Sequence, residues 1–358
     1  MPVVWLIDAY RAGERAQIRA LAEALDWPFE IKCLSYRKYE FLTNIFRGSD
    51  LRGIHINQSS PLQAPWPDLL ISAGMRNEPV CRWIRDQAVG KPKIVHVGRP
   101  WADPSCFGLV ITTPQYRLPR RDNVLQNSLT LHRVSEQRLQ HAGGQWQQQF
   151  EHLPGPYTAL IVGGNSGPFT FGPKAAARLA RQANALVQRA GGSLLVSTSS
   201  RTAMAAAQVL ERSLEVPHYF YHWRPADDAN PYFGMLGLAD RFIVTADSIS
   251  MLSEACATGR PVTMFDLGSG RYAMQAECTG ADSDNDFRLG GLLYRGLMRW
   301  GWQRLSRDIS LVHENLVQAG RAAWLGEMDT ATATLCASDL DAAVAAVHCL
   351  FQQQAVGS

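Results

Sequence analysis

Apolar runs of about five residues alternate with amphipathic stretches along the chain, a pattern that predicts parallel β-strands connected by helices. In the first half we expect helices at about residues 14–25 and 77–89, and strands at Val3–Ile7, Phe29–Leu34, Asp68–Ser72, Lys93–Val97 and Phe107–Ile111. In the second half the expected strands are Thr158–Val162, Leu194–Thr198, His218–Tyr221, Phe242–Thr245 and Val262–Phe265. The sequence therefore predicts two α/β domains built on doubly wound parallel sheets.

A stretch rich in Gly, Pro and Gln separates the two series of strands and is typical of a linker. We therefore expect an N-terminal domain at residues 1–140, a linker at 141–156 and a C-terminal domain at 157–335. The Ala-rich segment 336–358 predicts a final helix that can dock on either domain.

The composition is that of a globular protein without a membrane span. Hydrophobic residues make up 46% of the 358 residues, but no apolar run approaches the ~18 residues that a spanning helix needs. The seven cysteines are scattered singly, so neither a disulfide framework nor a zinc site is favoured. The N-terminus lacks the features of an export signal, and we expect a cytoplasmic location.

The charge is unevenly distributed. Residues 1–140 carry a net charge of +6 and residues 141–358 a net charge of −3. Two stretches, 35–47 and 297–307, also mix basic and aromatic side chains. Both features fit peripheral contact with an anionic membrane on its inner face, and both fit equally well an ordinary solvated surface and core packing. We expect no nucleic-acid partner.

The first candidate site is a Gly-rich loop between a predicted strand and a helix. It contains Gly163, Gly164, Asn165 and Ser166. Such a loop exposes N–H groups to a phosphate, and the following helix adds partial positive charge. Glycines at this position also serve tight turns, and the loop matches neither the dinucleotide pattern nor the Lys-containing P-loop.

A second candidate site follows the strand that ends near Thr245. Asp247 or Ser248 can cap the next helix, and Ser250, Met251 and Glu254 fall on its first turns. Hydroxyl and N–H groups at a helix start can hold a diphosphate, and a carboxylate nearby can accept both hydroxyls of a ribose. The same residues also fit a capped helix without a ligand.

Two further polar loops follow predicted strands. One contains Ser200 and Arg201, and the other contains Tyr221, His222 and Trp223. Arg201 can neutralise a phosphate, and the aromatic loop can supply backbone groups and a ring face to a base. Because ligands bind beyond the carboxyl ends of strands in doubly wound sheets, we expect all four loops to surround one crevice.

These motifs resemble a family of glycosyltransferase-like proteins known as mitochondrial fission proteins, which occurs in bacteria and plants. The resemblance is carried by Gly163-Gly-Asn-Ser-Gly, Ser199-Ser-Arg-Thr, Asn230-Pro-Tyr and above all the segment 244–255 with Thr258-Gly-Arg-Pro-Val. In the first half Asp8, Gly13 and Gln17 fit the opening motif of the family. The segments 67–74, 123–125 and 131–133 also resemble the sequence of the family. The match covers nearly the whole chain.

The resemblance implies a GT-B fold, in which two Rossmann-like domains face each other across a cleft. It implies that the C-terminal domain binds a nucleoside-diphosphate sugar as donor substrate, without a tightly bound cofactor or metal, and that the N-terminal domain binds the acceptor. Ser253-Glu254 also resembles a Ser-Glu pair of a bacterial peptidoglycan glycosyltransferase, in which the glutamate binds the ribose of the donor. The loop from Asp8 to Gly13 departs from the pattern of the family, which has a Gly-Lys-Pro-Gly-type loop there.

We therefore expect a transferase that moves a sugar to a glycan or glycolipid of the cell envelope, such as lipopolysaccharide core. Asp8 and Glu14 are the candidate catalytic carboxylates, with His55 and His96 as lesser candidates; a helix cap and a surface acid fit the two carboxylates equally well. Two alternatives stay open: an adaptor that binds a partner at a membrane, and a sugar-nucleotide epimerase. The base, the sugar, the acceptor and the anomeric outcome are not encoded in any motif.

Overall fold

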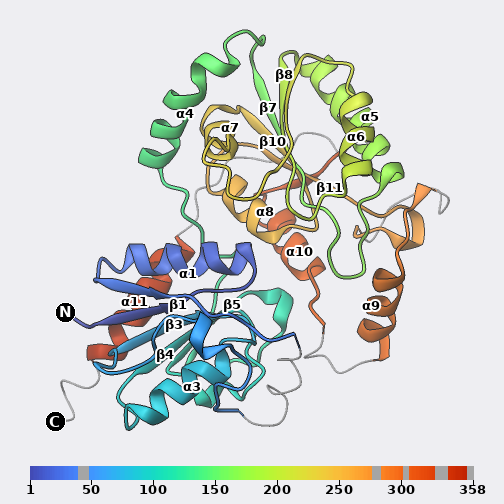
Figure 1. The fold of residues 1–358 in the computed structure, drawn as a ribbon. Helices are drawn as coiled ribbons and strands as arrows, with labels where there is room; N and C mark the ends of the chain where they lie inside the picture. The colour runs from blue at the N-terminus through green and yellow to red at the C-terminus, as the bar shows by residue number, and fades with distance from the viewer. Residues whose placement is uncertain (39–47, 276–283, 301–305, 327–337, 353–358) are drawn as a thin grey trace. The chain divides into compact units, whose positions relative to one another are not determined.

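The computed structural model describes residues 1–38, 48–275, 284–300, 306–326 and 338–352. The chain forms two compact units (Figure 1). Unit 1 comprises Met1–Arg133 together with Cys336–Ser358, and unit 2 comprises Val134–Leu335. Each unit is built around its own parallel sheet.

Unit 1 contains a sheet of six parallel strands in the order β2-β1-β3-β4-β5-β6. The fully buried run of β3 and the nearly buried run of β4 are typical of strands covered on both faces. The strands are β1 (Val4–Ile7), β2 (Phe29–Lys32), β3 (Leu69–Ala73), β4 (Lys93–Val97), β5 (Leu109–Thr112) and β6 (Val124–Gln126); the helices are α1 (Ala12–Ala24), α3 (Glu78–Gln87) and α11 (Asp339–Gln352), with single 3₁₀ turns at Ile56–Gln58, Pro104–Cys106 and Pro114–Tyr116.

Alternate residues of β1 point into two separate cores, as the period of a strand requires. Val4 and Leu6 pack with α1 and α11 on one face, and Trp5 and Ile7 pack with α3 on the other. The C-terminal helix α11 therefore completes unit 1, where Asp339 accepts the N–H groups of Ser128 and Leu129.

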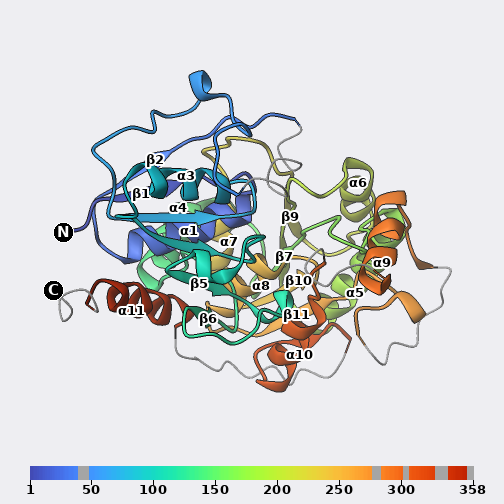
Figure 2. The ribbon, with the colours of Figure 1, turned by 90° about the horizontal axis from the view of Figure 1, so that it is seen from below.

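Unit 2 contains a second sheet of six parallel strands in the order β12-β11-β10-β7-β8-β9. In Figure 2 the labels β9, β7, β10 and β11 follow the reverse of this order, and β8, between β9 and β7, is not labelled. The strands are β7 (Tyr157–Ile161), β8 (Ser193–Ser197), β9 (His218–Tyr221), β10 (Arg241–Thr245), β11 (Val262–Phe265) and β12 (Ala323–Trp324). The helices are α4 (Glu136–Phe150), α5 (Pro173–Ala190), α6 (Met204–Arg212), α7 (Tyr232–Leu238), α8 (Ile249–Cys256), α9 (Leu289–Trp300) and α10 (Ser310–Gln318), with a 3₁₀ turn at Gly270–Tyr272. Two Rossmann-like domains with doubly wound parallel sheets are thereby confirmed.

Helix α5 shows how the sequence sets these elements. Pro173 occupies the first turn, where its missing N–H costs nothing, and the helix ends at Gly191, whose φ of +76° suits glycine. Its apolar residues recur every three to four positions, and Leu179 and Val187 are buried. Burial of each such side chain contributes about 1.5–3 kcal/mol, so packing on the sheet stabilises this helix.

The segment 141–156, expected as a linker, is helical as far as Phe150 because it belongs to α4. Gly143 and Gly144 indicate a break by propensity, but Phe150 is fully buried in a core with Leu195 and Met235. This tertiary contact outweighs the helix propensity of two glycines. The boundary of unit 2 accordingly lies at Val134.

Candidate functional site

The strand order of unit 2 places a topological switch point between β7 and β10. From β7 the chain moves to β8 and β9 on one side, and β10 and β11 then continue on the other side. The loops after β7 and β10 therefore start side by side and lead to helices on opposite faces of the sheet, which opens a crevice where α/β proteins bind ligands. The Gly-rich loop follows β7, and Asp247 follows β10.

The N–H groups of the Gly-rich loop are bound by neighbouring loops rather than exposed, which differs from the cradle expected from the sequence. The N–H of Gly163 donates to Thr245 Oγ1 at 2.7 Å, and that of Gly164 donates to Asp247 Oδ2 at 3.1 Å. The N–H of Asn165 donates to the carbonyl of Arg201 at 3.2 Å. In this structure the Asp247 carboxylate stands where a phosphate was expected.

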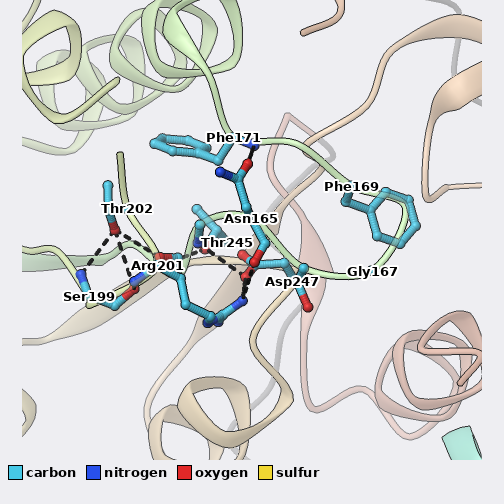
Figure 3. Close-up of polar contacts among 12 residues, drawn as sticks. Asn165, Gly167, Phe169, Phe171, Ser199, Arg201, Thr202, Thr245 and Asp247 are labelled. Atoms are coloured by element: carbon cyan, nitrogen blue, oxygen red, sulfur yellow. Dashed lines mark hydrogen bonds and ion pairs between the residues drawn. The ribbon is translucent and has the colours of Figure 1, made fainter. Parts of the chain in front are cut away.

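Gly163 and Gly164 allow the close approach of these loops, and Figure 3 shows Asn165, Arg201 and Asp247 of the three loops next to one another. A Cβ at Gly163 would lie 2.5 Å and 2.6 Å from the two carboxylate oxygens of Asp247. Gly164 has a φ of +137°, and a Cβ there would lie 2.2 Å from the carbonyl oxygen of Arg201. Any larger residue would push the three loops apart.

Arg201 and Asp247 form an ion pair at the centre of this site. Arg201 Nη1 lies 2.6 Å from Asp247 Oδ2 and also donates to the carbonyl of Asn165 at 3.3 Å. The Asp247 side chain is fully buried, whereas that of Arg201 is 36% exposed. Asp247 Oδ1 has no hydrogen-bond partner within the described parts of the chain. The guanidinium is thus oriented by a buried carboxylate while part of it faces solvent.

The loop after β8 binds the backbone carbonyl of Gly163 in the Gly-rich loop. The hydroxyls of Ser199 and Thr202 both donate to the carbonyl of Gly163, the latter at 2.8 Å. The N–H of Ser199 donates to Thr202 Oγ1 at 3.0 Å. Ser200 is exposed on this turn. Residues 163–165, 199–202 and 245–247 therefore meet at one point, as the sequence predicts.

Helix α8 begins directly after this contact point with an open amino end. Ser248 is its N-cap residue, and its side chain makes no capping hydrogen bond to the described residues of the helix. Its first N–H groups, which include those of Ser250 and Met251, have no partner within the helix because α-helical bonding starts one turn later. Ser248 is buried and Ser250 half-buried. This end carries partial positive charge suited to an anion.

Two arginines that the sequence analysis missed also contact the Gly-rich loop. Arg307 donates to the Ser166 hydroxyl, and Arg288 Nη2 donates to the carbonyl of Gly167 at 2.6 Å. Ser166 itself closes a small turn with Phe169, in which each N–H donates to the carbonyl of the other. Arg307 ends the basic and aromatic stretch 297–307, but nothing in that stretch indicates contact with a loop more than 100 positions away, and the same holds for Arg288.

The aromatic loop after β9 lies beside the loop after β8. The N–H of Trp223 donates to Thr198 Oγ1 at 2.8 Å, and the Trp223 side chain is 40% exposed. Tyr221 is buried, and its hydroxyl donates to Asp227, while His222 contacts Glu211 on α6. Of the three predicted residues, Trp223 and His222 are exposed and Tyr221 is buried.

Glu254 lies two turns into α8, on the side that faces α7. Its Oε2 accepts a hydrogen bond from the hydroxyl of Tyr232 at 2.5 Å. Burial raises the pKa of the Glu254 carboxyl to about 7, against the opposing effects of Tyr232 and Arg138. The structure shows no bond between Glu254 and the Gly-rich loop among the residues that it describes.

In unit 1 the two predicted catalytic carboxylates follow β1. Asp8 pairs with Arg15 at 3.0 Å and is 14% exposed. Glu14, on the first turn of α1, lies against Gly74, where a Cβ would come within 2.7 Å of Glu14 Oε2. Both carboxylates therefore lie at the switch point between β1 and β3 of the unit 1 sheet.

The two histidines of unit 1 differ in accessibility. His96 is fully buried in β4 next to Ser72, and burial lowers its pKa to about 3. This surrounding indicates a packing role. His55 lies at the start of an exposed 3₁₀ turn.

Within the described residues no group of three or more His, Cys, Asp or Glu side chains could hold a metal ion. None of the helices described is both long enough and apolar enough to cross a membrane. The basic and aromatic stretches 35–47 and 297–307 lie partly outside the described residues, at 39–47 and 301–305.

The chain is similar to several known proteins. A family model described as Mitochondrial fission ELM1 matches residues 12–276. Mitochondrial fission protein ELM1 of Arabidopsis thaliana is 26% identical over 236 residues, which cover 60% of this chain and 55% of that protein, or about half its length. An uncharacterized protein of Rickettsia prowazekii is 24% identical over 73% of this chain and 82% of its own. Among solved structures, E. coli ADP-heptose LPS heptosyltransferase II covers 88% of this chain and 99% of its own at 13% identity, with a TM-score of 0.43.

Proposed function

Because this chain belongs to the mitochondrial fission ELM1 family and has the two-domain α/β fold of the GT-B class, we propose that it is a nucleotide-sugar-dependent glycosyltransferase. Its acceptor would be a glycan or glycolipid of the cell envelope, such as lipopolysaccharide core. Its place of action would be the cytoplasm, at the inner face of the membrane.

The observation that carries this proposal is the gathering of positive groups around the Gly-rich loop of unit 2. Arg201 and Arg307 both contact the loop, and the open amino end of α8 follows the same contact point. Such groups stabilise the negative charge that develops on a departing nucleoside diphosphate, without help from a metal. Ser248 and Ser250 would add hydroxyls, and Trp223 would offer its exposed ring to the base.

The chemistry is a substitution at the anomeric carbon of the donor. The oxygen of an acceptor hydroxyl forms a bond to this carbon, while the bond from the carbon to the phosphate oxygen breaks. The electron pair of the broken bond leaves with the nucleoside diphosphate. The hydroxyl proton passes to a base, for which Asp8 and Glu14 are our candidates. Glu254, as a carboxylate, would accept the ribose hydroxyls.

A thermal-shift screen of UDP, GDP, ADP and CMP, each with and without EDTA, tests the proposal. One nucleoside diphosphate should raise the melting temperature, since a ligand at 100 times its Kd stabilises the folded state by about 2.7 kcal/mol, and EDTA should leave this effect unchanged. Arg201→Ala should abolish most of the shift. Arg189→Ala is the matched control, because Arg189 is exposed near the far end of α5 and, among the described residues, bonds to Ala185 of its own helix.

The outcomes separate the proposed enzyme from two other functions. If no nucleotide stabilises the protein, the glycosyltransferase proposal fails and the alternative of an adaptor that binds a partner at a membrane is favoured. Turnover of a nucleotide sugar without any acceptor would instead identify an epimerase. Loss of the thermal shift in EDTA would contradict the metal-independent mechanism.

A further inference from the structure

Helices α7 and α8 of unit 2 lie side by side in Figures 1 and 2 and are joined by a polar contact. Tyr232 is the first residue of α7, and its hydroxyl donates to Glu254 Oε2 at 2.5 Å. Both side chains are half-buried. Glu254 Oε1 makes no hydrogen bond to any described residue. Since a carboxylate oxygen has two lone pairs, Oε1 can still accept hydrogen bonds from a ligand.

Glu254 lies on the same face of α8 as Ser250, one turn further along the helix, because residues four positions apart project from one side. Ser250 belongs to the open amino end of α8, where the diphosphate of the donor is proposed to bind. In a nucleoside diphosphate the ribose is attached directly to the diphosphate. A diphosphate at the start of α8 therefore brings the ribose to the face that carries Glu254.

The Asn230-Pro-Tyr motif sets the position of the phenol. The Asn230 side chain accepts the N–H of Tyr232 at 3.0 Å, and the carbonyl of Pro231 accepts the N–H of Met235 at 2.8 Å, which starts α7. On its other side α7 packs tightly on α4, because a Cβ at Gly237 would lie 2.4 Å from a carbonyl oxygen of that helix. The motif thus fixes the backbone from which the ring reaches α8.

The Thr258-Gly-Arg-Pro-Val motif connects the far ends of the same two helices. It follows α8, where the Thr258 hydroxyl donates to the carbonyl of Ala255 at 2.7 Å. Arg260 then donates to three carbonyls at the end of α7, at 2.6, 2.8 and 2.9 Å. Tyr232 at the start of α7 and Arg260 at its end therefore both hold this helix against α8. Two motifs that the proposed function leaves without a role serve one geometry.

The contact also affects the charge of Glu254. Burial raises the pKa of its carboxyl to about 7, and the hydrogen bond from Tyr232 and the charge of Arg138 on α4 both oppose this rise. Among the described residues these are the two side chains that favour the ionised form. Without the phenol hydroxyl the pKa would therefore lie above 7, and less of the carboxyl would be ionised at neutral pH.

We propose that Tyr232 is a positioning residue of the donor site, whose hydroxyl orients the Glu254 carboxylate so that Oε1 accepts the hydroxyls of the donor ribose. The inference rests on the proposed glycosyltransferase function and narrows the class of its donor. That donor is a sugar carried by a ribonucleoside diphosphate. A deoxyribonucleoside diphosphate sugar binds poorly, because it leaves the partly buried carboxylate without one of its partners.

Calorimetry on the full chain tests this assignment with UDP, GDP and ADP, each compared with its 2′-deoxy counterpart between pH 6 and pH 9. The ribonucleotide that binds should do so at least tenfold more tightly than its 2′-deoxy form at pH 8, since it gives the carboxylate one more charge-assisted hydrogen bond. This preference should shrink towards pH 6, as Glu254 becomes protonated. Equal affinity of the two forms at every pH would overturn the proposal.

Substitutions separate positioning from a structural role. Tyr232→Phe should move the midpoint of this pH dependence upwards by about one unit and reduce the preference for the ribonucleotide at pH 7. Glu254→Gln should abolish the pH dependence, and adding Tyr232→Phe to it should have no further effect on the preference. A merely structural tyrosine would weaken both nucleotides equally and leave the midpoint in place, and that result would contradict the assignment.

Tyr157→Phe is the matched control. The Tyr157 hydroxyl also bonds inside unit 2, to the carbonyls of Phe150 and Leu153, but Tyr157 lies at the start of β7, at the opposite end of the strand from the Gly-rich loop. Its loss removes a phenol hydroxyl of similar burial without touching Glu254. The ribonucleotide preference and its midpoint should both stay at their wild-type values.

The outcomes distinguish this inference from the function on which it rests. If no nucleoside diphosphate binds wild-type protein, the transferase and the role of Tyr232 fail together. If a nucleoside diphosphate binds and its 2′-deoxy form binds equally well, the transferase stands and the role of Tyr232 is refuted. This comparison uses wild-type protein, so it decides the question even where Tyr232→Phe does not fold.

Discussion

Replacement of Gly163 by alanine is the sharpest test of how the donor loops meet. The added Cβ would lie 2.5 Å and 2.6 Å from the Asp247 oxygens, closer than real contacts allow. Because Gly163 does not have a positive φ, the backbone itself tolerates alanine. The buried Asp247 side chain must therefore shift, and with it the bonds to Gly164 and Arg201.

The magnitude follows from these contacts. Overpacking of a buried site costs about 1–3 kcal/mol, and a strained hydrogen bond to a charged group costs up to about 1.5–3 kcal/mol. Because Arg201 is partly exposed, the weakened bond between Arg201 and Asp247 contributes less than this maximum. The lower conformational entropy of the unfolded alanine variant stabilises the folded state by about 0.4–1 kcal/mol. We expect a net loss of about 2–3 kcal/mol, or roughly 4–12 °C in melting temperature for a domain of this size.

Urea denaturation of Gly163→Ala and Gly144→Ala measures this difference. Gly144 lies within α4 with open space where a Cβ would be, so alanine there should stabilise the protein by about 0.5–1 kcal/mol. Gly163→Ala should also lose at least tenfold in nucleotide affinity, since Arg201 loses its orientation. Wild-type stability together with wild-type nucleotide affinity would refute the role assigned to this contact.

Three further outcomes are expected. Nucleotide-sugar affinity, measured by calorimetry, should rise from about pH 6 to pH 8 as the Glu254 carboxyl with its pKa of about 7 ionises and can accept ribose hydroxyls, and an equal rise in Glu254→Gln would contradict this role. Burial lowers the pKa of His313, which donates a hydrogen bond to the carbonyl of Ala246, to about 4. Between pH 6.5 and pH 4 the unfolded chain therefore binds a proton that the folded chain does not, and the free energy of unfolding should fall by at most ~3 kcal/mol. His313→Phe should show a shallower slope in denaturation over this pH range, and an identical slope would count against it. Thr245→Val should cost about 1–3 kcal/mol in urea denaturation, because it leaves the buried N–H of Gly163 unpaired, whereas Thr245→Ser should be close to wild type; equal stability of the two would exclude that bond.

Local patterns were enough to predict most of the fold. The expected strands Asp68–Ser72 and Phe242–Thr245 contain continuous apolar runs and are observed at Leu69–Ala73 and Arg241–Thr245, and Pro173 and Gly191 mark the ends of a helix. Short elements with weak patterns, such as Val124–Gln126, were not predicted because neighbouring strands stabilise them.

Helix α4 shows where local propensity fails. Its Gly-Gly pair and Gln-rich sequence resemble a linker, but Trp146 packs so closely on α7 that a Cβ at Gly234 would come within 2.5 Å of its ring. This fit between two helices more than 80 positions apart leaves no signal in either segment alone. The packing of Trp146 on α7 therefore outweighs the low helix propensity of the two glycines.

The candidate site divides in the same way. Strand ends predicted that the loops containing Gly163, Arg201 and Asp247 would meet, because parallel strands share one carboxyl edge. They did not predict that Asp247 would bind the N–H of Gly164, a contact over 83 positions, nor that Arg307 would reach Ser166 over 141. Topology places loops, but side-chain partners depend on distances that no spacing encodes.

The central claim is that the loops around Gly163, Arg201 and Asp247 bind a nucleoside diphosphate. Hydrogen–deuterium exchange of the full chain, with and without the best nucleotide from the thermal screen, tests it most directly. We predict slower exchange in peptides covering residues 161–170, 198–205 and 246–252, with little change in peptides from residues 1–133. Protection confined to residues 1–133, or unchanged exchange in all three segments of unit 2 while the nucleotide binds, would contradict the claim.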